Sequence, residues 1–208
     1  MSHKQLIEAL IEDCVPVQRL APPRVQLMRF SLFVVFYLCI VVSAVSLRAD
    51  LSEQLRHFDF YRDLLILSLL STTSGLLTLS LARPGVSSTR SLVVIAILVT
   101  SWVMTTSLSS SHEPYPLSEP DYSCARLVIL TMILLGGIFC IMLKSAYCTR
   151  PKLTALLALL TCSSVGGLSV QIVCPGSGFS HLFYWHLLPV LIGPLLGGLI
   201  LARFLRDR

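Results

Sequence analysis

Two cysteines and two histidines in the C-terminal half of the chain carry the side chains best suited to redox or metal chemistry. Cys124 stands apart in sequence, whereas Cys174 is followed closely by His181 and His186. Two thiolates and two imidazoles form a donor set that fits a tetrahedral, zinc-like site. Their spacing matches no established metal signature. Three interpretations therefore stay open: a redox- or metal-responsive pair, a static disulfide, and cysteines without a role.

The remaining cysteines and the motif content point away from catalysis. Cys39, Cys140 and Cys162 lie in apolar segments and are interpreted as small apolar side chains, while Cys148 is expected in a reducing loop. The chain has no C-x-x-C, H-E-x-x-H or G-x-S-x-G sequence and no Gly-Lys-Ser/Thr phosphate loop. We therefore predict that the protein is not an enzyme.

The elements that must position these side chains are strongly apolar. Of 208 residues, 54% are hydrophobic and 13% are charged, whereas soluble domains carry about 25% charged residues. A span of a bilayer needs about 20 apolar residues. Six segments approach that length, and we predict an all-α bundle of six transmembrane helices over 30–47, 64–82, 91–110, 127–143, 153–173 and 182–202.

The distribution of basic residues predicts the orientation of this bundle. Lysines and arginines concentrate in the N-terminal segment, in the second and fourth loops and at the C-terminal end. The opposite loops carry only Arg48, Arg56, Arg62 and Arg126. Because basic loops stay in the cytoplasm, we predict that both termini are cytoplasmic.

This orientation places the two candidate cysteines together at the outer face. The fourth and fifth spans form a hairpin, Cys124 precedes one span, and Cys174 ends the other. The two thiols should lie at similar depth in an oxidising compartment. We predict a sensor pair, supported by His181, His186 and Trp185, with a thiol-bound metal ion as the one candidate cofactor. His186 could instead be an ordinary interfacial residue beside Trp185.

The N-terminal segment has the pattern of an amphipathic helix. Ser2 with Gln5 is a capping-box pattern, and apolar residues recur at helical spacing over residues 2–14. This helix could lie on the membrane or on the protein's own loops, or it could dock in the groove of a soluble partner. Its polar face is acidic, which disfavours an anionic membrane surface. The apolar face and the segment after it comprise Leu6, Ile7, Leu10, Ile11, Cys14, Pro16, Val17 and Leu20.

Several short motifs resemble the NrsF family of anti-sigma factors. They are D-C-V-P-V-Q-R-L-A-P-P-R at 13–24, Arg-Pro-Gly at 83–85, Trp-His at 185–186, and the cysteines Cys124 and Cys174. The resemblance implies a multi-pass protein of the bacterial inner membrane. It also implies that residues 1–29 bind an extracytoplasmic-function sigma factor, and that residues 30–208 form the transmembrane sensor. The implied partners are that sigma factor and membrane lipid, without direct binding of nucleic acid.

Two other functions remain as alternatives. The first is a small-molecule or metal transporter, which the lack of a central charge in the six segments disfavours. The second is a membrane enzyme that uses a thiol–disulfide couple at the outer face.

Overall fold

The computed structural model describes residues 3, 11, 21–83, 85, 88–109, 122–143, 148, 150–176 and 178–206. Within these ranges the chain is helical, and no strand occurs. Six of the helices are long and apolar enough to cross a membrane, which confirms the all-α class and the number of predicted spans. The helices are α2 (Pro23–Val45), α3 (Leu51–Gln54), α4 (Phe58–Leu81), α5 (Thr89–Ser109), α6 (Tyr122–Leu143), α7 (Pro151–Val173), α8 (Phe179–His181), η1 (Leu182–Leu187) and α9 (Leu188–Arg206).

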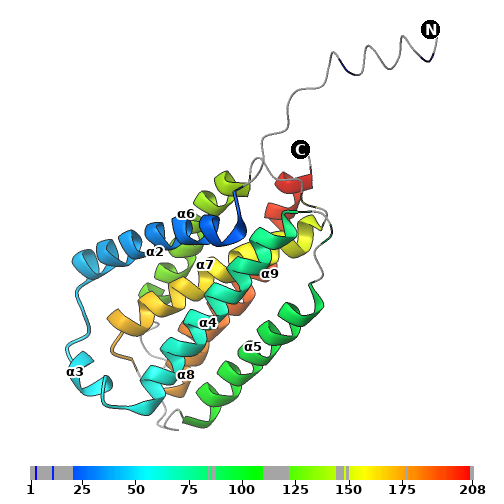
Figure 1. The fold of residues 1–208 in the computed structure, drawn as a ribbon. Coiled ribbons are helices and arrows are strands. Elements are labelled where there is room, and N and C mark those ends of the chain that lie inside the picture. The colour runs from blue at the N-terminus through cyan, green and yellow to red at the C-terminus, as the bar shows by residue number, and fades with distance from the viewer. Residues whose placement is uncertain are drawn as a thin grey trace.

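Helix α7 is the central element of the bundle, and it packs against α4, α6 and α9 (Figure 1). Its small residues permit this close packing. A Cβ atom on Gly166 would lie 3.0 Å from the Cα atom of Val128 in α6. On another side, a Cβ atom on Gly198 of α9 would lie 3.2 Å from the Cα atom of Leu156. Gly166 and Gly198 therefore lie at sites of direct helix contact.

Buried hydroxyl groups of α7 are satisfied within the bundle. The Ser163 hydroxyl donates to the carbonyl oxygen of Val190 in α9 at 2.9 Å. Thr161 and Ser74 of α4 share a hydrogen bond of 3.0 Å between their hydroxyl oxygens. Because buried polar groups without partners are costly, these bonds favour one particular packing of α4, α7 and α9.

The outward surface of the bundle is apolar. Large side chains such as Phe36 of α2, Ile133 of α6 and Leu199 of α9 are more than half exposed. Soluble monomers rarely expose apolar surface on this scale, whereas lipid would cover it without cost.

The helix bounds differ from the predicted spans mainly at their beginnings. The first span begins at Pro23, because proline is well tolerated in the first turn of a helix. The second begins at Phe58, so Asp59 and Asp63 belong to a helix and not to the preceding loop. Cys124 lies within the first turn of α6 and does not precede it. In the last span, α8, η1 and α9 follow one another, so His181 is helical as well.

Candidate metal or redox centre

The side chains of Cys124, Cys174, His181 and His186 meet in one buried cluster at one end of the bundle. Their sulfur and nitrogen ligand atoms all lie within 4.8 Å of one another. The Cys124 thiol donates to the sulfur of Cys174 at 2.9 Å, and that sulfur lies 3.1 Å from Nε2 of His181. The four residues are exposed by only 5%, 4%, 1% and 4%, in chain order. We call them the Cys/His cluster.

Four elements deliver these residues: α6, the end of α7, α8 with His181, and η1 with His186. Cys124 comes from the first turn of α6, and Cys174 caps the C-terminal end of α7. The turn after Cys174 folds tightly over the histidine, since a Cβ atom on Gly176 would lie 2.6 Å from the His181 ring. Any larger residue at position 176 would displace that ring.

A π-helical turn brings the two histidines together. In an α-helix of about 3.6 residues per turn, residues five apart point to different sides. The segment η1 is a π-helix, whose hydrogen bonds join residues five apart. His181 and His186 therefore lie close to each other, with ring centres 5.1 Å apart and planes inclined by 70°. If the segment is assumed to be a regular α-helix, two histidines five residues apart do not predict a metal site.

The electrostatics of the cluster favour the thiolate form of Cys174. The hydrogen bond from the Cys124 thiol lowers the pKa of Cys174 below its ordinary value. Burial opposes that shift, and the neighbouring His181 and His186 reinforce it. Nε2 of His186 is buried and has no hydrogen-bond partner among the described residues. Such an atom is available to a ligand that the cluster could hold.

The cluster geometry is compatible with two reactions. A disulfide needs the two sulfurs at about 2.05 Å, so Cys124 and Cys174 would have to approach by less than an ångström. A tetrahedral ion with bonds of about 2.0–2.3 Å to nitrogen and sulfur would need the ligand atoms within roughly 4 Å of one another. The widest pair of ligand atoms would have to contract slightly, whereas the two sulfurs, 2.9 Å apart, would have to separate to about 3.7 Å.

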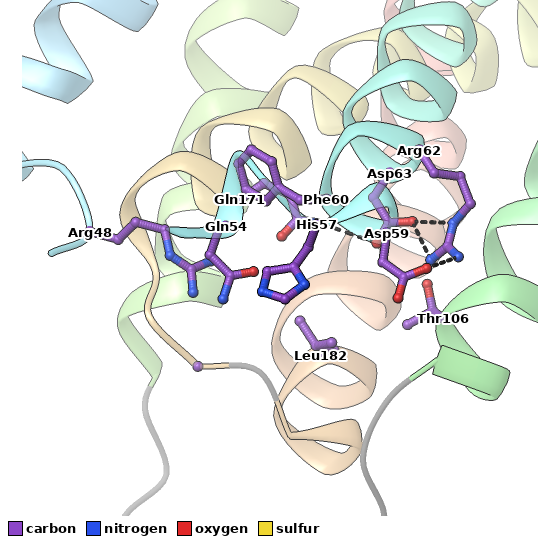
Figure 2. A pocket seen from close by; sticks show the side chains of 11 residues that line it. Arg48, Gln54, His57, Asp59, Phe60, Arg62, Asp63, Thr106, Gln171 and Leu182 are labelled. Carbon is purple, nitrogen blue, oxygen red and sulfur yellow. Dashed lines mark hydrogen bonds and ion pairs between the residues drawn. The ribbon is translucent and has the colours of Figure 1, made fainter. Parts of the chain in front are cut away.

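A polar cavity of about 230 Å³ lies beside the cluster and is lined by Arg48, Gln54, His57, Asp59, Phe60, Arg62, Asp63, Thr106, Gln171, Gly176 and Leu182 (Figure 2). Arg62 donates to Asp63 at 3.1 Å, and Gln171 of α7 donates to the other oxygen of that carboxylate at 3.3 Å. Figure 2 shows Asp59, Arg62 and Asp63 together on α4, facing the cavity.

Arg48 holds the loop after α2 against the end of α7. Its backbone N–H donates to the carbonyl oxygen of Ile172 at 3.3 Å, and its guanidinium donates to that of Pro175 at 3.4 Å. The same guanidinium binds Asp50 at 2.7 Å, and this hydrogen bond lowers the pKa of Asp50 to about 2. These contacts hold the loop directly against the segment that carries Cys174.

A comparison with known families matches most of the chain. The family described as "Negative regulator of sigma F" (NrsF) matches residues 10–206. The chain belongs to the NrsF family. No curated protein and no solved structure matches it. The family description makes the protein a negative regulator of a sigma factor and is not that of an enzyme family.

The structure places the other predicted site residues as follows. Trp185 packs edge-on against Tyr122 of α6, with ring centres 5.0 Å apart, and contributes no ligand atom to the Cys/His cluster. Ile11 is 65% exposed. The other predicted sigma-binding residues lie outside the described residues: Leu6, Ile7, Leu10, Cys14, Pro16, Val17 and Leu20.

Sequence reasoning missed the polar residues of the cavity. From the sequence alone, charged residues at the edge of a predicted span look like ordinary loop residues, and this applies to Arg48, Arg62 and Asp63. Gln171 was a usable signal, because it is an amide within an otherwise apolar segment and lies three residues before Cys174.

Proposed function

We propose that the protein is a membrane-bound anti-sigma factor that holds an extracytoplasmic-function sigma factor at the cytoplasmic face of the bacterial inner membrane. Residues 1–29 bind the sigma factor, and residues 30–208 form the six-helix sensor. The Cys/His cluster at the outer face receives an oxidant or a thiophilic metal ion, and the sigma factor is then released. Membership of the NrsF family supports the regulatory role. The buried Cys/His cluster is the single observation that supports the sensory role.

The two functional regions are separated along the bundle. Arg83, just after the C-terminal end of α4, donates a hydrogen bond to the carbonyl oxygen of Ala21, next to the proposed sigma-binding segment. Asp63, near the N-terminal end of α4, binds Gln171 beside the cluster. A helix of 24 residues spans about 36 Å, which is enough to cross a membrane. This separation supports a sensor on one side and a sigma-binding segment on the other.

Both signals would act through the same thiols. With hydrogen peroxide, Cys124 and Cys174 form a disulfide, each thiol loses a proton and an electron, and the peroxide is reduced to two waters. With a metal ion, the thiols lose their protons and the sulfurs coordinate the ion. A disulfide would draw the ends of α6 and α7 together, whereas a tetrahedral ion would move the two sulfurs slightly apart and draw the more distant ligand atoms inward.

The release of the sigma factor needs only a modest free energy. A change from 1:99 to 99:1 between two states requires about 5.5 kcal/mol of differential binding. Metal binding at structural sites supplies about 10–16 kcal/mol. The cluster could therefore drive the change even if only part of that energy reached the cytoplasmic side.

Affinity purification of the full chain tests the sigma-binding role. We expect the intact protein to retain a sigma factor that mass spectrometry identifies, and a variant lacking residues 2–22 to lose it. Leu10→Asp should also lose it, because the substitution places a charge on the predicted apolar face. Gln5→Glu introduces the same charge on the opposite predicted face, keeps the capping-box pattern and serves as the control. If the intact protein retains no sigma factor, the proposed function is wrong.

A further inference from the structure

The Cys/His cluster is buried, and a charged signal needs a polar route to it. All four residues are at most 5% exposed. An ion that crossed the apolar surface of the bundle would lose its hydration without compensation, at a cost of many kcal/mol. A hydrated ion must instead approach through polar side chains.

The structure contains such a route. The cavity of about 230 Å³ has room for several waters. A second space of about 10 Å³, close to the minimum for a single water, lies next to it. The two spaces share Asp63, Thr106, Gln171 and Leu182, and the smaller one is also lined by His186 of the cluster.

The charges along this route favour a cation at its inner end. The guanidinium of Arg48 is paired with Asp50, and that of Arg62 is shared between Asp59 and Asp63, so two carboxylates stand against one positive charge on α4. At the narrow part, Asp63 accepts a hydrogen bond from Gln171, a neutral amide, and contributes a buried carboxylate. Beyond it lies His186, whose buried Nε2 has no hydrogen-bond partner among the described residues.

We propose that the cavity is the entrance to the Cys/His cluster for a hydrated divalent cation. At its inner end, the carboxylate of Asp63 binds the ion as it leaves water and passes it to His186 and the thiols. Gln171 positions this carboxylate. The inference rests on the metal-binding branch of the proposed function and adds the route and the class of signal. Asp63 governs how fast the ion arrives, whereas the cluster governs how tightly it is held.

Co²⁺ uptake by the full chain in detergent, kept reduced and anaerobic, tests this proposal. Stopped-flow absorption follows sulfur-to-cobalt charge transfer, and the final tetrahedral cobalt spectrum measures the amount bound. A focused negative charge raises the association rate of a cation by at least about tenfold. We therefore expect Asp63→Asn to slow uptake by at least about that factor, with the same final amount of bound cobalt.

Two further variants keep the test decisive. Arg62→Gln removes a positive charge from the entrance and should speed uptake, an effect that misfolding would not produce. Glu53→Gln removes one negative charge from exposed α3, outside the cavity lining, and should leave the rate unchanged. If both Asp63→Asn and Arg62→Gln take up cobalt at the wild-type rate, the cavity is not the entrance, and the proposed metal site is unaffected. Failure of the wild-type chain to bind Co²⁺ through its thiols would overturn the entrance and the metal branch together, without affecting the redox branch.

Discussion

At the residue scale, Cys174 is the side chain on which the cluster converges. Its sulfur contacts the Cys124 thiol and Nε2 of His181. The residue itself directly follows α7, the most buried of the six spans. A bond formed at this sulfur therefore acts on α6, α7 and the π-helical turn at once. Cysteines elsewhere lack this position: Cys39 is exposed on α2, and Cys162 is packed within the apolar core.

The thiols are expected to be necessary for the response. Cys124→Ser and Cys174→Ser should each abolish induction of sigma-dependent transcription by an oxidant or a thiophilic metal, because neither a disulfide nor the full ligand set can form. A transcriptional reporter in cells measures this response. Cys39→Ser, on the exposed face of α2, is the matched control and should respond normally. An unchanged response in both cluster variants would exclude the thiols as the sensor.

The histidines distinguish the two kinds of signal. His186→Gln removes one metal ligand and leaves both thiols in place. We expect the affinity for Co²⁺ to fall by at least about tenfold, given that even outer partners of metal ligands contribute 10–100-fold. Disulfide formation with a peroxide should persist, as measured by thiol titration. Unchanged cobalt affinity in His186→Gln would show that the imidazole is not a ligand.

At the element scale, α7 can occupy the centre of the bundle because glycine, which has no side chain, lets neighbouring helices approach it closely. Gly166 lets the backbones of α6 and α7 approach, and α6 and α7 carry the two cysteines of the cluster. The distance between Cys124 and Cys174 is thus set by helix packing several residues deeper in the bundle. The α4–α7 contact has a similar role, since it aligns Asp63 with Gln171.

A methyl group at position 166 tests this packing. Gly166→Ala would place a Cβ atom 3.0 Å from a backbone atom that cannot rotate away, so the helices must separate. Overpacking of this kind costs about 1–3 kcal/mol, and we expect a lower unfolding temperature in detergent and slower disulfide formation at the cluster. In Gly137→Ala the new Cβ has no atom within 4 Å, and the helix gains up to about 1 kcal/mol in propensity. Equal unfolding temperatures for the two variants would contradict this account of the packing.

At the scale of the whole molecule, the bundle keeps its two regions of polar chemistry apart. One end carries the Cys/His cluster and the polar cavity, and the other carries the Arg83–Ala21 contact that leads into the N-terminal segment. The apolar helices between them expose large side chains such as Phe36 and Leu199. A signal at one end can therefore reach the other only through rearrangement of the helices.

Reporter fusions test the orientation of this arrangement. Alkaline phosphatase is active only outside the cytoplasm, so we expect activity when it is inserted between residues 111 and 121. A fusion at residue 206 should be inactive, whereas green fluorescent protein fused there should fluoresce. The reverse pattern would place the Cys/His cluster in the cytoplasm and remove the basis for an outer-face signal.

The sequence by itself determined the helical class, the number of spans and the proximity of Cys124 and Cys174, because hydropathy and hairpin connectivity depend on residues close in sequence. It did not determine that His181 and His186 converge, since this requires a π-helical turn in place of a regular α-helix. Nor did it reveal the pairing of Asp63 with Gln171, which are far apart in the chain and meet only because α4 packs on α7. Only the tertiary structure placed a polar cavity beside the cluster, because a cavity arises from how helices fit together and not from the composition of any one of them.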